Sequence, residues 1–594
     1  MEIVWDLSEM FPSTTDPSIQ KTIDGLIKTA EDFSTKYQGK IIGLSSIELL
    51  KCTEEFEAYH AKLCEINSFA ALLFAANMTL PDTQSLDGKM KKTKVKLDKV
   101  MAFFKIEMAN LVCQKPGIIH EPILQNYRHF LKRLKVGVPH QLSESEEELI
   151  IEKDQFGVVA WQDFRNKWVS TRMLEAEVEG KKKTLPFGDA YGLLFHCDRA
   201  TRESAHKSIY GLFEKDGEIF ASALRNISSD WLNVCERRKY DSPIEASLIA
   251  NDIHQQTIAC LLKTVEDHVA MYQRYLRLKA KLMNLPKLGC HDIFGPIPGT
   301  PVIRFDYDKA RDLVVEAYSR FDEDYAFAVK DMFAKNHVDP SPRLGKSFGA
   351  FCRDWYNGKS AFILCNFNGS LIDVYTLAHE LGHATHAYYY QRNQTILNGS
   401  SESLPMIVAE TASVFGEQLL TDILLDRAES NKEKEAIICG ILDVAGRLIF
   451  ETANSALFEQ SLYDAIKRGE YLDYKTISEY WTRARSKFYA DSVEWFNESS
   501  ARWAMIPHFY FANFRFFNYP YVYAQMFAYA LYQKYLEEGK EFVPKFKKML
   551  SAGSSISPME LSKTVDLNVT NSEFWELGLK QYDYLIKELQ KIVT

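Results

Sequence analysis

The chain has 594 residues, of which 46% are hydrophobic and 25% charged, and its formal net charge is −9. A chain of this length can bury a large core and usually forms more than one structural unit. The mildly acidic balance, without a basic cluster, argues against nucleic-acid binding, which requires a positively charged surface. We therefore expect no nucleic-acid partner.

The cysteines and the N-terminus indicate a cytoplasmic protein. The ten cysteines are scattered and none forms a C-x-x-C pair, so we interpret them as reduced thiols rather than a disulfide framework. The N-terminal residues "MEIVWDLSEMFPS" include acids and lack the basic and apolar regions of a signal peptide. The longest apolar run, "FAALLFAA", is too short to span a bilayer, so we expect no membrane partner.

Most of the sequence predicts helix. In residues 45–74 and 80–110, apolar side chains recur every three or four positions with charges between them. Residues 346–370 instead contain two short β-prone runs, at 348–352 and 361–367, separated by a glycine-containing linker, as in a long-looped hairpin. We expect a mainly α-helical fold with one small sheet before the histidine-rich segment. The run at 361–367 is predicted to be an edge strand, which an extended peptide could pair with.

The histidine-rich segment, residues 376–390, reads "TLAHELGHATHAYYY", and His379, Glu380 and His383 spell H-E-x-x-H. On a helix, side chains four residues apart lie on the same face. Two imidazoles at this spacing can bind one ion at about 2.0–2.1 Å from each nitrogen. The motif also arises by chance in roughly a few per cent of chains of this length, so a zinc site requires a third ligand.

Three other residues in or just before this segment have predicted roles. Asp373 is the expected N-cap of the helix. Gly382 costs about 1 kcal/mol relative to alanine in a helix interior, which suggests that another backbone approaches closely there. His386, one turn beyond His383, is expected to be an ordinary histidine satisfied by hydrogen bonds rather than a ligand.

A second helix supplies a candidate third ligand. After a polar loop, Ser403 is the expected N-cap and Pro405 suits the first turn. Glu410 follows in an apolar stretch, where a buried acid needs a partner, and a metal ion would provide one. His379, His383 and Glu410 would then form the ligand set of a catalytic zinc peptidase. The alternative is a salt bridge within the helical core. Glu417, farther along the same face, is predicted to orient a ligand histidine.

This constellation predicts hydrolytic chemistry. Zinc with three protein ligands keeps one position for water, whose pKa falls from about 15.7 to about 7. Glu380 lies off the ligand face and suits a general base. Far downstream, the aromatic-rich residues 503–532 contain His508, Tyr519 and Tyr521, which we expect to donate hydrogen bonds to a developing oxyanion. Most of the other rings of this segment are expected to be core.

These segments together resemble a known family. "TLAHELGHATHAYYY", "VAETASVFGE" and "IPHFYF…FFNYPYVY" are similar to oligoendopeptidase F among the thimet-oligopeptidase-like zinc peptidases. The resemblance extends over most of the chain, from "WDLSEMFPS" through "EEELIIEKDQFGVVAWQDF" to the C-terminal aromatic segment, and is most specific in residues 345–417.

The resemblance implies an elongated helical zincin of the gluzincin type with a deep substrate channel. Residues 1–200 would form a helical domain that caps the channel, and residues 201–594 the catalytic domain. One zinc ion would be bound by His379, His383 and Glu410, with Glu380 as the catalytic carboxylate. The family's histidine donor would fall on His508. Its tyrosine donor would fall on one or more of Tyr510, Tyr519 and Tyr521.

We therefore predict a cytoplasmic zinc oligoendopeptidase that cleaves internal bonds of short, unstructured peptides. Two alternatives stay open. A peptidyl-dipeptidase or carboxypeptidase on a similar fold would need a cation to bind the substrate C-terminus, and Arg353, Arg447 and Arg502 are candidates. A non-catalytic peptide-binding protein would use zinc structurally, but structural zinc sites favour four ligands and cysteine.

Overall fold

The computed structural model describes residues 2–301 and 303–593, and this part of the chain is mainly helical with short strands, which confirms the expectation of a mainly α-helical fold. The zincin type and the deep channel stay predictions. It divides into two compact units of interleaved segments. Unit 1 comprises Met1–Val138, Val302–Asp426 and Lys534–Asn568, and unit 2 comprises Pro139–Pro301, Arg427–Gln533 and Val569–Thr594. The functional division into a capping part, 1–200, and a catalytic part, 201–594, stays a prediction.

Unit 1 contains the histidine-rich segment. Its helices are α1 (Pro17–Tyr37), α2 (Ser46–Ala76), α3 (Pro81–Gln114), α4 (Arg128–Gly137), α13 (Tyr307–Phe321), α14 (Glu323–Ala334), α15 (Leu371–Asn393), α16 (Met406–Ala409), α17 (Thr411–Arg427), α23 (Phe542–Ser551) and α24 (Pro558–Lys563). Helices α2 and α3 confirm the helices predicted at 45–74 and 80–110. Ser45 begins α2 with a capping box to Glu48, which satisfies backbone donors of the first turn.

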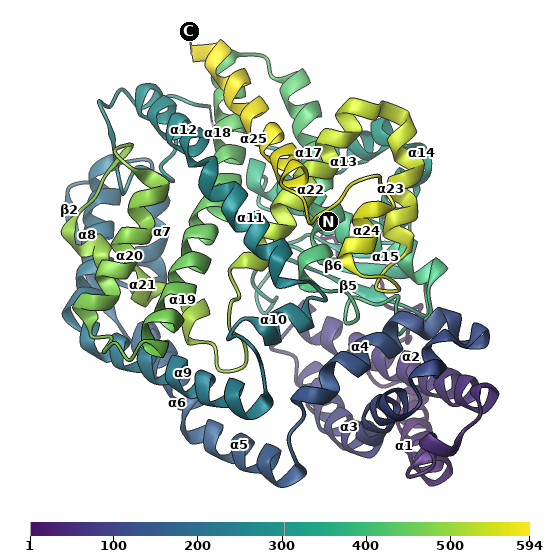
Figure 1. Ribbon diagram of the computed structural model, residues 1–594. Helices are drawn as coiled ribbons and strands as arrows, with labels where there is room; N and C mark the ends of the chain where they lie inside the picture. The colour runs from purple at the N-terminus through teal and green to yellow at the C-terminus, as the bar shows by residue number, and fades with distance from the viewer. Residues whose placement is uncertain (1, 302, 594) are drawn as a thin grey trace. The chain divides into compact units, whose positions relative to one another are not determined.

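The N-terminal helices of unit 1 pack against the sheet that precedes α15. The core of α1–α4 is rich in aromatic rings, and Phe56 stacks on Phe104 with centroids 4.0 Å apart. Trp355, Phe362 and Leu364 of the sheet belong to the same buried cluster. Figure 1 shows these purple helices grouped together, with β5 and β6 lying beside α15. This packing places α2 next to the sheet.

The sheet corrects one prediction about strand order. It consists of β4 (Val338–Asp339), β5 (Phe351–Trp355) and β6 (Ser360–Leu364), in the order β4-β6-β5. The predicted hairpin is confirmed as the antiparallel pair β5–β6, although its loop is short. The run predicted as an edge strand is nevertheless central, because the two-residue strand β4 pairs with β6 on its other side. The edge is β5.

Unit 2 is also helical. Its helices are α5 (Glu144–Phe156), α6 (Val158–Ser170), α7 (Phe187–Gly192), α8 (Arg199–Lys215), α9 (Gly217–Arg238), α10 (Glu245–Ala250), α11 (Gln255–Asp267), α12 (Val269–Leu282), α18 (Asn431–Gly446), α19 (Thr452–Lys467), α20 (Tyr474–Tyr489), α21 (Arg502–Met505), α22 (Tyr519–Glu538), whose last residues belong to unit 1, and α25 (Ser572–Val593). Its core includes Trp168, Phe213 and Phe220.

Two further sheets in unit 2 were not expected from the sequence. Strands β1 (Met173–Val178) and β2 (Lys181–Pro186) form an antiparallel hairpin. The turn residues Glu179 and Gly180 have φ of 51° and 76°, as a tight hairpin turn requires. Strands β3 (Leu288–Gly289) and β7 (Val493–Glu494) pair in parallel over two residues. Among the described helices of both units, none has the length and apolarity required to cross a bilayer.

Candidate active site

The H-E-x-x-H motif lies on α15, which begins one turn earlier than its predicted cap. Ser370, not Asp373, is the N-cap: its hydroxyl accepts from the Asp373 backbone N–H at 3.2 Å, and Asp373 accepts in return from the Ser370 N–H at 2.9 Å. The two residues form a capping box, so Asp373 occupies its third helical position. The acid therefore still stabilises the helix start.

Two histidines of α15 converge on one carboxylate. The Nε2 atoms of His379 and His383 lie 3.1 Å and 3.3 Å from Oε2 of Glu410. One ligand atom from each residue lies within 4.8 Å of the others, which is compatible with a single ion. Each of the three side chains is partly exposed, between 24% and 37%, so water and a substrate can reach the site.

Glu410 lies at a break between two helices, which corrects the prediction of one continuous helix capped by Ser403. Helix α16 is a single turn, Glu410 has φ −83° and ψ 5°, and α17 begins at the next residue. The Ser403 hydroxyl donates instead to the Ser400 carbonyl at 2.7 Å. Backbone angles of this sparsely populated kind are common at active sites, and here the break aims Glu410 at α15.

The predicted alternative for Glu410 was a salt bridge within the helical core. Glu410 does form ion pairs with His379 and His383, and among the described residues no lysine or arginine pairs with it. Its carboxylate contacts the two histidines and accepts from the Ser413 hydroxyl at 2.8 Å. Burial favours a neutral acid, but the hydrogen bonds from His379 and His383 outweigh it and lower the pKa of Glu410 well below its ordinary value. The carboxylate therefore stays ionised and favours a cation nearby.

A second carboxylate contacts His379 at the ring nitrogen that does not face Glu410. Oε1 of Glu417, on α17, lies 2.6 Å from Nδ1 of His379. Burial opposes the charged imidazole, yet hydrogen bonds to Glu410 and Glu417 raise the pKa of His379 well above its ordinary value. Because Nδ1 is engaged by Glu417, Nε2 is the nitrogen that faces Glu410.

The histidines and Glu410 line a pocket of about 360 Å³ in unit 1. Glu380 lines the same pocket but is only 7% exposed, and burial raises the pKa of its carboxyl group. His386 also borders it. Burial lowers the pKa of His386 to about 3, and it is not part of the three-residue cluster. A buried acid beside a polar, open site can accept and return a proton.

Gly382 allows α15 and α17 to approach closely, which confirms the expectation drawn from its helix-breaking cost. A Cβ atom at this position would lie 2.4 Å from both the Ala412 carbonyl oxygen and the Ser413 Cα. Backbone atoms cannot move aside independently, so any larger residue must separate the two helices that carry the site.

We expect Gly382→Ala to lower the free energy of unfolding by about 1–3 kcal/mol, because overpacking forces the helices apart. Peptide hydrolysis should fall with it, since Glu410 directly precedes α17 and would be displaced with that helix. Chemical denaturation and a peptide assay measure both effects. The control is Gly440→Ala on α18, where a Cβ meets nothing within 4 Å; alanine there should be neutral or stabilising, by up to about 1 kcal/mol. Equal stability for Gly382→Ala and the native chain would contradict this packing.

The predicted oxyanion donors lie in unit 2. Nδ1 of His508 lies 2.9 Å from Oδ1 of Asn518, and its ring stacks on Tyr521 with centroids 5.7 Å apart. The Tyr519 hydroxyl is buried, 3.0 Å from the Ser247 hydroxyl and 3.2 Å from the Asn251 side-chain nitrogen. Burial raises the pKa of Tyr519 to about 12. Of the predicted tyrosines, Tyr521 is the one stacked on His508. That these donors act at the H-E-x-x-H site stays a prediction.

Tyr510, the remaining candidate donor, is buried in unit 2. Its side chain lies in the aromatic core, 6.3 Å from Phe220 between ring centroids, and Arg165 lies over its ring. Burial raises the pKa of its phenol far above the ordinary value. This environment is typical of a core residue.

A buried acid, Glu459, neighbours the His508 segment and gives unit 2 a pH-dependent stability. Oε1 of Glu459 accepts from the Phe516 backbone N–H at 2.8 Å, and the side chain is buried. Burial raises the pKa of Glu459 to about 7. The folded chain therefore holds a proton that the unfolded chain releases above about pH 4.5, so stability falls as the pH rises from about 4.5 to 7.

We expect Glu459→Gln to raise the free energy of unfolding by up to about 3 kcal/mol above pH 7, because the amide cannot ionise. The gain should shrink to a few tenths of a kcal/mol at about pH 4.5, where the carboxyl group is protonated in the folded chain and half protonated in the unfolded chain. Melting temperatures measured from pH 4.5 to 8 provide the comparison, with the exposed Glu479→Gln on α20 as control. A constant difference between variant and native chain across this range would refute the assignment.

The helical fold and the clustered histidines and glutamate are features of a peptidase class. The chain belongs to peptidase family M3, whose family model matches residues 193–581. A second model, described as Oligopeptidase F, matches residues 117–171. The chain is therefore a peptidase of this family.

Full-length relatives support this membership. The chain is 26% identical to the group B oligopeptidase PepB of Streptococcus agalactiae, covering 99% of this chain and 97% of the relative. It is 25% identical to the oligopeptidase PepF of Bacillus subtilis, covering 100% of this chain and 87% of the relative. Among solved structures, oligoendopeptidase-F from Enterococcus faecium is 23% identical, with a TM-score of 0.69 over 97% of this chain and 99% of that one. A Chlamydophila abortus chain reaches a TM-score of 0.88 at 20% identity, over 99% and 98%.

The structure also brings residues to the pocket that the sequence did not indicate. Asp354 of β5 accepts from the Ser401 backbone N–H at 2.9 Å and from its hydroxyl at 2.6 Å, and both residues line the pocket. Cys352 and Leu404 line it as well. These positions follow from pairing between a strand and a distant polar loop, for which the sequence carries no local signal.

Proposed function

We propose that this chain is a cytoplasmic, zinc-dependent oligoendopeptidase that hydrolyses internal bonds of short, unstructured peptides. The observation that carries the proposal is the approach of His379 and His383 to one oxygen of Glu410, at 3.1 Å and 3.3 Å, in a pocket that Glu380 also lines. Membership in a peptidase family supports peptides as the substrate class.

The residues of the site fit a zinc ion. Two imidazole nitrogens and one carboxylate oxygen are the ligands of many catalytic zinc sites. Glu410 has no lysine or arginine partner in the described chain, so a cation would balance its charge. His379, His383 and Glu410 would hold the ion, and Glu417 would keep His379 oriented. When bound, zinc supplies Lewis acidity, which acidifies a water molecule and polarises a peptide carbonyl.

The remaining steps belong to side chains of this protein. Glu380 takes a proton from the attacking water and delivers it to the leaving amine. Its buried position keeps the proton from exchanging freely with solvent. His508, together with Tyr519 or Tyr521, is proposed to donate hydrogen bonds to the oxyanion, which is the charge that develops during attack.

The edge strand β5 offers a place for the substrate backbone. Phe351, Cys352 and Asp354 of this strand line the pocket that contains the histidines. An extended peptide that pairs with β5 would be held mainly by main-chain hydrogen bonds, which do not depend on side-chain identity. We therefore expect broad sequence tolerance, with pocket shape setting the preferences.

The alternative, an exopeptidase, needs a cation for the substrate carboxylate, and the candidate arginines have other contacts. Arg353 donates from Nε to the Ser68 hydroxyl at 2.8 Å. Arg502 is partly buried, with 12% of its side chain exposed, and forms an ion pair with Glu451 in unit 2. The guanidinium of Arg447 lies 6.0 Å from the Phe294 ring centroid. These contacts favour endopeptidase action without requiring it.

An amidated peptide separates the two activities. We expect a fluorogenic peptide with a C-terminal amide to be cleaved internally with kcat/KM within about fivefold of its free-acid form, because an exposed charge contact contributes about 1 kcal/mol or less. Mass spectrometry of the products locates the cut. Loss of cleavage on amidation, or cuts only near the free C-terminus, would favour an exopeptidase. Binding without cleavage of either peptide would favour a non-catalytic protein.

A further inference from the structure

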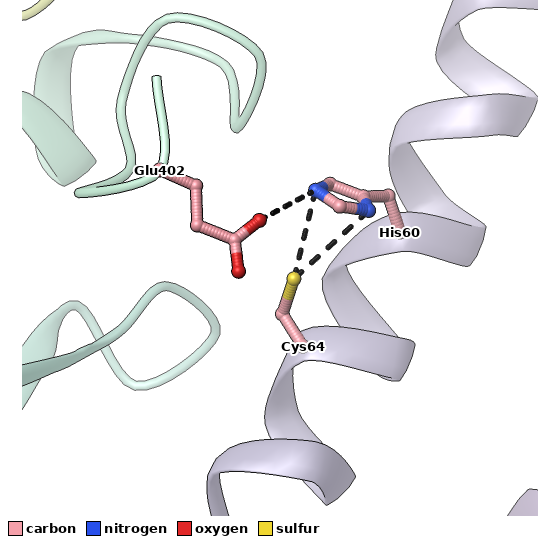
Figure 2. Close-up of side chains that lie close together, drawn as sticks. All are labelled: His60, Cys64 and Glu402. Carbon is pink, nitrogen blue, oxygen red and sulfur yellow. Dashed lines mark hydrogen bonds and ion pairs between the residues drawn. The ribbon is translucent and has the colours of Figure 1, made fainter. Parts of the chain in front are cut away.

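A second cluster of metal-ligating side chains lies elsewhere in unit 1. His60 and Cys64 are one helical turn apart on α2, and Glu402 reaches them from the loop between α15 and α16, as Figure 2 shows. Nε2 of His60 lies 3.6 Å from Sγ of Cys64 and 3.8 Å from Oε2 of Glu402. One ligand atom from each lies within 4.8 Å of the others.

These separations are compatible with a shared ion, and without one the Cys64 thiol is within hydrogen-bond distance of His60. With Zn–S near 2.3 Å and Zn–N near 2.05 Å, a tetrahedral site separates sulfur from nitrogen by about 3.6 Å. The observed Sγ–Nε2 distance has this value. The His60–Glu402 distance of 3.8 Å is too long for a hydrogen bond, and Sγ is almost as close to Nδ1, at 3.9 Å. A rotation of the imidazole would aim Nε2 at an ion between the three groups.

The ring of His60 packs against Phe56, and nearby cations contact other residues. The imidazole of His60 stacks on Phe56, with centroids 5.8 Å apart and the planes inclined by 12°. The nearby cation Lys94 is paired with Asp98 at 2.7 Å, and Arg353 donates to Ser68.

The cluster is also linked to the catalytic pocket through Glu402. The adjacent residue, Ser401, bonds to Asp354 of β5, and both line the pocket that contains His379. An ion bound by Glu402 and α2 would fix the loop at this point.

We propose that His60, Cys64 and Glu402 form a second metal site, for a soft divalent cation such as zinc, and that its occupancy tethers the pocket-lining loop to α2. Thiolate and imidazole ligands select zinc and related transition metals over magnesium and calcium. Three protein ligands leave one position for water, so the ion is exchangeable.

Cobalt provides a test that distinguishes the two clusters, because the His379, His383 and Glu410 cluster contains no thiol. Cys352 lines the catalytic pocket, so the Cys64→Ser variant decides which thiol is bound. Adding cobalt to protein already loaded with one equivalent of zinc should produce a sulfur-to-cobalt charge-transfer band in the near ultraviolet. Cys64→Ser should abolish the band, and the exposed Cys113→Ser should retain it. Absence of the band in the native chain, or its persistence in Cys64→Ser, would overturn the proposal.

A second variant avoids any effect on folding. The Glu402 side chain is 61% exposed, and Glu402→Gln should weaken cobalt binding by at least about tenfold, as the loss of a ligand carboxylate implies. Hydrogen exchange of residues 399–405 should slow when cobalt binds to the native chain and not to Cys64→Ser. Unchanged exchange despite a charge-transfer band would overturn the tether, and unchanged affinity in Glu402→Gln would remove Glu402 from the site.

Discussion

Replacing Glu380 with Gln is expected to lower kcat/KM for peptide hydrolysis by about 10²–10⁴-fold, the usual contribution of a general base. The amide has nearly the same shape as the carboxylate but cannot accept the water proton. Because Glu380 lies off the face that His379 and His383 share, zinc content should remain at one equivalent in the catalytic site. Steady-state kinetics and elemental analysis of the same preparation measure the two quantities.

Two comparisons sharpen this result. Glu380→Asp keeps a carboxylate on a side chain that is one methylene shorter. This variant should therefore retain more activity than Glu380→Gln. Circular dichroism and melting temperature should match the native chain for both, since the substitutions preserve or reduce volume. Near-native hydrolysis by Glu380→Gln with zinc bound would show that another group accepts the proton.

The second large effect concerns zinc affinity. Glu410→Gln removes a proposed ligand and should weaken zinc binding by more than about 100-fold, and activity should be lost at limiting zinc. Glu417→Gln removes only the group that orients His379 and should weaken binding by about 10–100-fold. The amount of zinc that each variant retains after dialysis against a chelator measures both effects.

The matched pair distinguishes a ligand from its support. Both residues lie on the α16–α17 segment, and each carboxylate contacts His379. Excess zinc should restore the activity of Glu417→Gln more readily than that of Glu410→Gln. If the two variants lose zinc equally, or if Glu417→Gln loses more, the assigned roles are wrong.

Local features of the site could be predicted because they depend on helix geometry. The i, i+4 spacing of His379 and His383 requires only that α15 is helical, and the close approach at Gly382 followed from the cost of a glycine in that position. The apolar surroundings of Glu410 indicated that it needed a partner. The predicted N-cap was three residues too late in the chain. Ser370 and Asp373 share one capping box, and both residue types suit a helix start.

The misplaced features depend on contacts between distant segments. Strand β6 is central because β4 pairs with it over two residues, too few to leave a pattern in the sequence. The break at Glu410 arises where α17 packs against α15. His60, Cys64 and Glu402 meet only because the loop after α15 folds back toward α2, and more than 300 residues separate the first two from the third.

The most direct test is a zinc-edge anomalous difference map from crystals of Glu380→Gln grown with a peptide substrate. The account predicts a peak between His379, His383 and Glu410, within about 2.0–2.2 Å of one nitrogen or oxygen of each. It also predicts an uncleaved peptide beside β5. A map without a peak there, or a zinc ion coordinated by the histidines with Glu410 beyond ligand distance, would contradict the proposed site.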